Sequence, residues 1–435
     1  MKTNRIFLSL LLALVMLQGC GSKGSSGSSS AANGSVRLVN ATTAYASLDM
    51  TTSGPTTAPT TSVTLATAVA TGSASSYASI APGTYPLSLN VSGSGTPAAQ
   101  QSVIISSGVT YTMLAYTARG QLQLVALTDD EVAPATGDGK IRLSNLALSD
   151  TGGVDVYVAG NGVTLSNASP LVSNLGIASG YFEIPQGTYH IWVTGVSNKA
   201  DVRLDLPAVV ISNQQVLTLV LTATTGGVLV DGWLVTQQGA VTAQANALAR
   251  VRVAASIAAL GTVVATANGV LLDASTLVSP AVDTYALVPA GALSMSVVVN
   301  GNPINVPNLN AAAGADLTLL AVGSAASPTF SLLSDDNRLP LGGIAKLRLV
   351  NGINGLAGNI SLTVDANLVA QNVVLGTASA AGTLVTTGNI SQLQVNGPGN
   401  VSLGTSGATL KSQGVYSVFM LGDYPATAEI VRADR

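Results

Sequence analysis

Few residues of this 435-residue chain could carry out acid–base or metal chemistry, since it contains one His, one Cys and 20 acidic residues. A zinc site built from three His or four Cys cannot be assembled from one of each, and neither can a disulfide framework. Any histidine-based catalysis therefore depends on His190 alone. We expect no cofactor and no enzymatic activity.

His190 belongs to a predicted strand whose alternating residues Tyr189, Ile191 and Val193 face a core. His190 and Trp192 would then project from the opposite face of the strand, where an aromatic pair could contact a sugar ring or a partner surface. We favour the alternative, a solvated strand face with an incidental Trp. Catalysis by His190 is not expected, because nothing in the sequence orients its ring.

Four acids in the segment 129–138 could provide oxygen ligands for Ca²⁺: Asp129, Asp130, Glu131 and Asp138. They lie between two predicted domains, where a bound ion would stiffen the hinge. The matching segment at 237–239 has no carboxylate, so Ca²⁺ binding would not be a property of every repeat. We therefore favour a solvated strand end and expect no metal.

An arginine recurs at the start of four predicted strands, each time after an apolar residue: Arg37, Arg142, Arg252 and Arg348. A structural role needs only the domain itself, so we expect each arginine to bridge to a neighbouring strand or to a carboxylate such as Asp155. The net charge is −3 and only 9% of the residues are charged, so no dense basic face exists to attract nucleic acid.

The arginine-containing strand is the first of three landmarks that recur in the same order four times. The second is a turn such as Pro82 to Tyr85, and the third is a late apolar strand such as Tyr111 to Leu114. The landmarks recur at closely matching offsets. The sequence therefore predicts four repeats of one fold, covering residues 36–138, 139–248, 249–344 and 345–435.

Within each repeat the apolar residues alternate with a period of two, as in Leu293 to Val297, which is typical of strands with one face on a core. Turn signals such as Asn161-Gly162 and Asn300-Gly301 separate the strands at short intervals. Short strands at this density predict an all-β chain, a tandem array of four immunoglobulin-like antiparallel β-sandwiches. A single β-solenoid is the alternative, but its shorter period of about 20 to 50 residues is not found.

The second repeat carries the clearest family motif, with Ile141-Arg142-Leu143, then Val154 to Val158, then Tyr181 to Tyr189. This order resembles the bacterial domain of unknown function 4397, fully in the second repeat and partly in the other three. The resemblance implies exported, often lipid-anchored sandwich proteins. It brings no catalytic residues that could be carried over to this chain.

The N-terminal segment has the form of a secretory signal, with Lys2 and Arg5 before an apolar run over 6–17. That run is shorter than the about 20 residues that a membrane-spanning helix needs. It ends at Leu17-Gln18-Gly19-Cys20, which resembles the lipobox of bacterial lipoproteins and implies that residues 1–19 are removed and that Cys20 is lipidated.

Residues 20–35 then form a lipidated Cys and a Gly/Ser tether of about 20 Å. In such lipoproteins an Asp directly after the lipidated Cys favours retention at the inner membrane, and this chain has Gly21 at that position. The resemblance therefore suggests an exported bacterial lipoprotein at the outer membrane.

Together these features predict a lipid-anchored cell-envelope protein that contacts the membrane through its lipid, binds a polysaccharide or a surface protein, and does not bind nucleic acid. The alternative is an envelope glycan hydrolase or lyase. It would need two carboxylates about 5 to 10 Å apart across a cleft, and no paired acidic motif recurs in the repeats.

Overall fold

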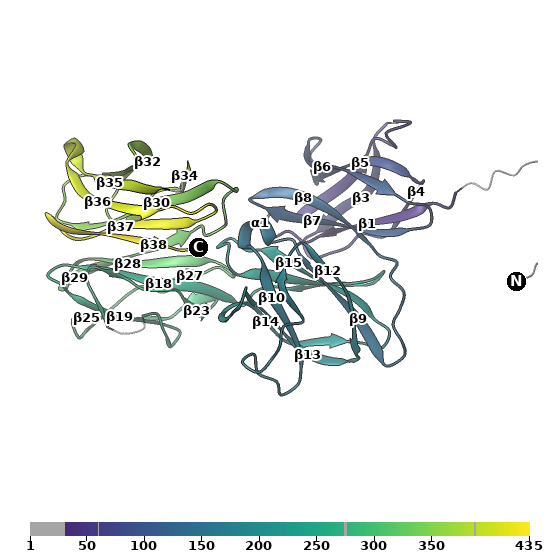
Figure 1. The fold of residues 1–435 in the computed structure, drawn as a ribbon, viewed down its shortest axis with the longest axis horizontal. Helices are drawn as coiled ribbons and strands as arrows, with labels where there is room; N and C mark the ends of the chain where they lie inside the picture. The colour runs from purple at the N-terminus through teal and green to yellow at the C-terminus, as the bar shows by residue number, and fades with distance from the viewer. Residues whose placement is uncertain (1–30, 60, 274–275, 387–388) are drawn as a thin grey trace, which may run out of the picture.

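The computed structural model describes residues 31–59, 61–273, 276–386 and 389–435, which are nearly all β-structure (Figure 1). Within these ranges the strands form four sandwiches in chain order, which we call sandwich 1 (34–128), sandwich 2 (138–244), sandwich 3 (248–335) and sandwich 4 (344–433). The predicted all-β fold of tandem sandwiches is confirmed. The predicted signal peptide and Cys20 lie outside the described residues.

Sandwiches 1 and 2 each consist of two sheets. In sandwich 1 the sheets have the strand orders β4 (Ala78–Ile80), β1 (Gly34–Asn40), β7 (Thr110–Ala118), β8 (Gln121–Thr128) and β3 (Val63–Ala70), β2 (Ser47–Thr52), β5 (Gly83–Val91), β6 (Pro97–Ile105). In sandwich 2 they are β12 (Ala178–Pro185), β9 (Asp138–Asn145), β15 (Val216–Ala223), β16 (Val230–Thr236), β17 (Val241–Gln244) and β11 (Val172–Leu175), β10 (Val154–Gly160), β13 (Gly187–Gly195), β14 (Asn198–Ile211). The short helix α1 (Leu148–Thr151) follows β9.

Sandwiches 3 and 4 repeat this plan with more broken edge strands. Sandwich 3 has β18 (Leu248–Ile257) between β28 (Asp316–Ser324) and the edge pieces β22 (Ala281–Val282) and β23 (Ala286–Pro289), with β29 (Ser327–Asp335) beyond β28. Its second sheet contains β19 (Thr262–Ala267), β20 (Val270–Leu271), β21 (Leu277–Val278), β25 (Met295–Val299) and β26 (Asn302–Ile304), and β24 (Gly291–Leu293) pairs with β27 (Leu309–Ala311).

In sandwich 4 one sheet contains β33 (Thr377–Ala378), β34 (Gly382–Val385), β30 (Ile344–Asn354), β37 (Val415–Asp423) and β38 (Ala426–Ala433). The other contains β32 (Asn367–Val373), β31 (Ile360–Val364), β35 (Ile390–Asn396) and β36 (Ser402–Thr409), and a 3₁₀ turn covers Pro398–Asn400.

One strand pair in each sandwich is parallel, namely the opening strand and the late strand: β1 with β7, β9 with β15, β18 with β28, and β30 with β37. A parallel pair needs a long connection, and here the second sheet of the sandwich provides it. The other paired strands are antiparallel, as predicted. The arginine landmark and the late-strand landmark are therefore neighbours in one sheet.

The two sheets of a sandwich have different burial patterns. Strands of the second sheet alternate, as in β2 and β19, because one face packs on the core and the other faces solvent. The late strands β15 and β37 are buried at almost every position, which means that both of their faces are covered. We call the sheet that contains the opening and late strands the inner sheet.

The inner sheets pack face to face, so the sandwiches form two pairs (Figure 1). Sandwiches 1 and 2 share an apolar layer in which Leu114 meets Val220 and Trp233, and sandwiches 3 and 4 share a second layer around Leu320 and Phe419. A linear rod, the simplest arrangement of four tandem domains, is therefore not what forms. Each inner sheet has its own core on one side and the partner sandwich on the other.

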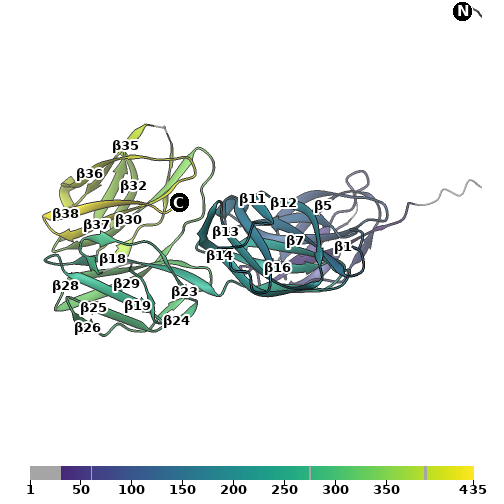
Figure 2. The same cartoon turned by 60° about the horizontal axis from the view of Figure 1, so that its bottom comes forward.

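The two pairs of sandwiches meet near the middle of the molecule (Figure 2). They are joined by backbone hydrogen bonds of the loop 224–229 and of α1. The Gly226 N–H donates to the Gly314 carbonyl at 3.1 Å, and the Asn337 N–H donates to the Gly226 carbonyl at 2.9 Å. The Leu339 N–H also donates to the Asp150 carbonyl at 2.8 Å. These contacts hold sandwiches 2 and 3 and the segment before sandwich 4 together.

Candidate functional site

The His190 environment differs from the expectation. Trp192 does lie on the face of β13 away from the core of sandwich 2, but it is only 6% exposed and packs with Tyr157, Leu165 and Ala168. The expected exposed Trp is therefore wrong, because the loop between β10 and β11 covers it. The Trp192 ring offers no open face to a sugar.

His190 itself is oriented, contrary to the expectation that nothing holds it. Its ring stacks on Trp192 with centroids 3.7 Å apart, and its Nε2 atom lies 2.5 Å from Oδ1 of Asp205. A carboxylate that fixes a histidine ring is part of many general-base arrangements. Within the described ranges, however, no nucleophilic hydroxyl or thiol is hydrogen-bonded to this ring.

The four acids considered as Ca²⁺ ligands do not converge. Asp129 is buried against Arg37 at 3.2 Å and accepts hydrogen bonds from Tyr77 and Thr112. Asp130 is exposed, and Glu131 pairs with Lys140 at 2.7 Å. Asp138 opens β9 and is half-buried. No group of three metal-ligating side chains occurs in the described part of the chain.

The opening arginines have the expected structural role but different partners. Asp155 was a candidate partner, yet it accepts hydrogen bonds from the backbone N–H groups of Asn174 and Ser197 at 2.7 and 2.8 Å. Arg37 instead pairs with Asp129, which directly follows the last strand of sandwich 1, and donates to the carbonyls of Thr236 and Gly239 in sandwich 2. The arginine thus joins the two sandwiches of a pair.

Sandwiches 3 and 4 exchange their ion pairs reciprocally. Arg252 of sandwich 3 pairs with Asp434, which follows the last strand of sandwich 4, at 2.5 Å. Arg348 of sandwich 4 pairs with Asp335, which ends sandwich 3, at 2.6 Å. Both arginines and both aspartates are buried. This arrangement is that of a two-fold symmetric interface, built here within one chain.

The pair of sandwiches 1 and 2 lacks this reciprocity. Arg142 donates to Thr218 at 3.1 to 3.2 Å and lies over the Tyr181 ring at 4.7 Å, and among the described residues it forms no ion pair. The position that holds Asp335 and Asp434 in the other pair is occupied in sandwich 2 by Gln237, which exchanges hydrogen bonds with the Glu131 backbone.

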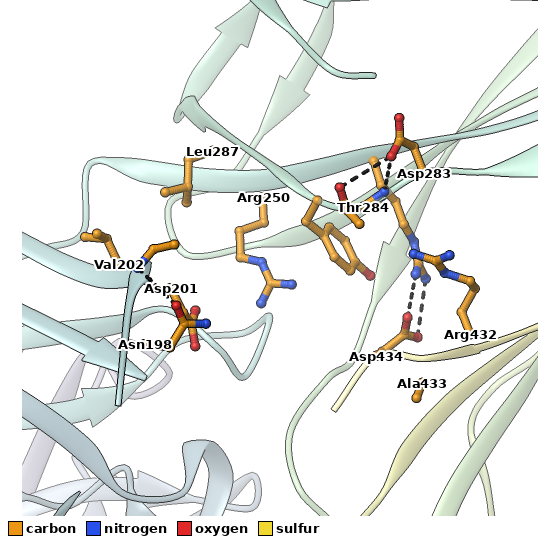
Figure 3. A pocket seen from close by; sticks show the side chains of 13 residues that line it. Asn198, Asp201, Val202, Arg250, Asp283, Thr284, Leu287, Arg432, Ala433 and Asp434 are labelled. Atoms are coloured by element: carbon orange, nitrogen blue, oxygen red, sulfur yellow. Dashed lines mark hydrogen bonds and ion pairs between the residues drawn. The ribbon is translucent and has the colours of Figure 1, made fainter. Parts of the chain in front are cut away.

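A cavity of about 510 Å³ opens where sandwiches 2, 3 and 4 meet (Figure 3). Strand β14 contributes Asp201, strand β18 contributes Arg250 and Arg252, and the end of sandwich 4 contributes Arg432 and Asp434. We call it the junction cavity. Its volume is in the range of small-molecule sites, and such sites often lie between domains.

Ionisable groups behind the junction cavity are strongly perturbed. Burial, opposed by Arg250 and Asn337, raises the pKa of Asp316 to about 7. Burial and the neighbouring Asp335 raise the pKa of Tyr285 well above its usual value, so this phenol stays protonated and donates to Asp335 at 2.5 Å. Arg435 is also buried, which lowers its pKa to about 10, and it donates to the carbonyls of Thr151 and Gly227.

The cavity could not be predicted from the sequence, since its walls come from three repeats. Arg252 was recognised as a recurring position, but Arg250 and Arg432 have no counterpart in the landmark pattern. One available signal was the uninterrupted apolar late strand, which indicates a second packed face and hence an interface between sandwiches.

No helix in the described ranges is long and apolar enough to cross a membrane.

The geometry defines a class of protein: tandem β-sandwiches packed in two pairs, with buried charges joining the members of each pair. The chain belongs to the family described as domain of unknown function (DUF4397), which matches residues 34–157 and 249–356. Each match covers an odd-numbered sandwich and continues into its packed partner, through β9 and part of β10 in sandwich 2 and through β30 in sandwich 4.

Among solved structures, the chain has a likeness to the Bacillus anthracis TIE protein, with 10% identity over 66% of this chain and a TM-score of 0.15. The chain spans 50% of the length of that structure, and at this TM-score the likeness carries no argument about function. No curated protein shows a significant match.

Proposed function

We propose that this protein is a lipid-anchored scaffold of the bacterial cell envelope, held at the outer membrane through Cys20, that presents binding surfaces and has no catalytic activity. The observation that carries the scaffold role is the use of buried charge. Arg37, Arg252 and Arg348 all join one sandwich to its partner. Fixed contacts of this kind favour a rigid body over a set of independent modules.

The carboxylates near the cavities support the absence of catalysis. A glycan hydrolase needs an acid with a raised pKa and a second, ionised carboxylate with access to substrate. Asp316 has the raised pKa, but Asp335, which lines the same small cavity, is fully buried. Asp335 is engaged by Tyr285, Thr318 and Arg348, so it cannot approach a glycosidic bond.

The anchoring part of the proposal rests on the Leu17-Gln18-Gly19-Cys20 motif and on the Gly/Ser segment that follows it. A tether of about 20 Å would place sandwich 1 next to the membrane surface with the other sandwiches free to contact envelope components. A polysaccharide or a surface protein is the expected partner, and a nucleic acid is not, given the net charge of −3.

Metabolic labelling tests the anchor. Cells expressing the full chain should incorporate labelled palmitate into it and retain it in the membrane fraction, whereas the Cys20→Ala variant should lose both properties. Ser22→Ala is the matched control, since it changes a neighbouring residue and leaves the thiol in place. Equal labelling of the Cys20→Ala variant and the wild type would refute lipidation at this position.

A further inference from the structure

The junction cavity contains two arginines whose hydrogen-bonding capacity the protein itself does not use. The Arg250 side chain is only 13% exposed, yet its nearest carboxylate oxygen, on Asp316, is 3.6 Å away, beyond hydrogen-bond range. Its guanidinium lies 4.3 Å above the centre of the Tyr285 ring, which fixes its orientation without satisfying its N–H groups. Among the described residues no acceptor is hydrogen-bonded to this guanidinium.

Arg432 is the second such residue. It lies on β38, is half-buried, and its side chain has no ion pair or hydrogen bond with the described part of the chain. Figure 3 shows Arg432 beside Asp434 on one side of the cavity, Asn198 and Asp201 on the other, and Arg250 between them. The two arginines therefore line one cavity from two different sandwiches.

The acids of the cavity are already occupied. Asp434 receives a two-pronged contact from Arg252, with N···O distances of 2.5 and 3.3 Å, and a hydrogen bond from Ser417. Asp201 accepts two hydrogen bonds from Arg203 at 2.9 and 3.0 Å. Asp283, the third acid that lines the cavity, accepts a hydrogen bond from the Thr284 N–H at 2.6 Å. Among the described residues, Arg432 forms no ion pair with any of these three carboxylates.

We propose that the junction cavity binds a small ligand that carries an oxyanion, a carboxylate or a phosphate, held by Arg250 and Arg432. Guanidinium groups present several N–H donors in a plane that matches these anions, and both arginines lie on the wall of one cavity with no protein acceptor among the described residues. The cavity volume of about 510 Å³ fits a monosaccharide acid or a sugar phosphate. This inference rests on the binding role proposed above and does not depend on the lipid anchor.

Isothermal titration of the full chain in detergent tests the proposal with three probes: sodium glucuronate, sodium phosphate and neutral glucose. We expect glucuronate or phosphate to bind and glucose to bind at least tenfold more weakly. The tighter of the two anions identifies the source of the oxyanion. Glucose binding as tight as that of both anions would overturn the proposal.

The arginine is tested by the Arg432→Gln variant, which should fold normally because the side chain has no partner to lose. We expect anion affinity to fall at least tenfold, or about 1.4 kcal/mol. The control is Lys411→Gln, an exposed residue outside the cavity whose loss changes the net charge equally and should alter affinity less than twofold. Undiminished binding by Arg432→Gln would refute the site.

Hydrogen exchange of the wild-type chain provides a measurement that does not depend on a variant. Saturating anion should slow exchange in β38 and in the segment 283–287, which line the cavity from two sandwiches. Unchanged exchange there would count against the junction cavity even if an anion binds elsewhere. If the protein incorporates palmitate but binds neither anion, only this inference is overturned. If it binds an anion but incorporates no palmitate, only the proposed lipid anchor is overturned.

Discussion

Replacing Arg252 by Met removes one of the two buried arginine charges that join sandwiches 3 and 4 while keeping an apolar stem in the interface. Arg252 is 1% exposed and donates to Thr318 at 2.9 Å and to Asp434 at 2.5 Å. The substitution leaves Asp434, whose side chain is 2% exposed, without its cation. Because removal of one partner strands the other charge in a buried site, we expect a loss of about 3 to 5 kcal/mol of stability.

Arg142→Met is the matched control, since Arg142 occupies the same position in sandwich 2. Its partners are a hydroxyl, on Thr218, and the face of the Tyr181 ring, so no carboxylate is stranded when the charge is removed. A part-buried hydrogen bond to a hydroxyl and a cation–π contact each contribute about 1 kcal/mol. The expected loss is therefore about 1 to 2 kcal/mol.

Urea unfolding separates the two effects because both Trp residues of the chain, Trp192 and Trp233, lie in sandwich 2. Trp fluorescence should follow the pair of sandwiches 1 and 2, and hydrogen exchange in β37 should follow the other pair. Arg252→Met should destabilise β37 and leave the fluorescence transition nearly unchanged. Equal losses from Arg252→Met and Arg142→Met would refute the claim that the stranded carboxylate sets the cost.

Two further predictions concern the junction between the pairs. Gly226→Val should separate the pairs without unfolding the sandwiches, because a Cβ there would lie 2.6 Å from both the Asp316 backbone nitrogen and the Gly314 carbonyl oxygen. Small-angle scattering should then show a larger radius of gyration, and an unchanged radius would contradict the close approach. Folding raises the pKa of the Asp316 carboxyl to about 7, so the wild type should lose up to about 4 kcal/mol of unfolding free energy as pH rises from about 4 to about 7. The stabilisation is complete at low pH, where the carboxyl is protonated, and is lost through pH 7. Asp316→Asn should flatten this fall in urea melts, and equal pH profiles for variant and wild type would contradict it.

The fold was predictable because local patterns decide it. Alternation such as Leu293 to Val297, turns such as Asn300-Gly301 and the recurring landmarks all act within one repeat. The pairing of sandwiches depends on contacts between repeats, and its trace in the sequence is the run of buried residues in late strands such as Leu217 to Leu221. A strand whose apolar residues alternate packs one face on a core, whereas a strand that is apolar at every position packs both of its faces.

The candidate site was less predictable, for two physical reasons. Alternation correctly placed Trp192 on the face opposite the core, but it contains no information on the loop that covers that face. The junction cavity brings Asp201, Arg250 and Arg432 together from three sandwiches, and none of them belongs to a motif. Sites of this kind depend on how the sandwiches dock, which repeat patterns do not specify.

Two features that are separate in the sequence are the two halves of one contact in the structure. The opening arginine lies on the strand that pairs with the late strand. The late strand also pairs with the last strand of the sandwich, and the acid lies two residues beyond the residue that pairs with the late-strand Thr or Ser. At this position each acid accepts a hydrogen bond from that Thr or Ser: Asp129 from Thr112, Asp335 from Thr318 and Asp434 from Ser417.

A carboxylate in that position is paired with a guanidinium and is therefore not free to bind a metal ion. Because the carboxylate is buried, it needs such a partner. Gln237 marks the one sandwich in which the acid is missing, and there the arginine turns to a hydroxyl and an aromatic ring. The acids between the repeats therefore serve the packing of sandwiches, which accounts for their recurrence in a chain with so few charges.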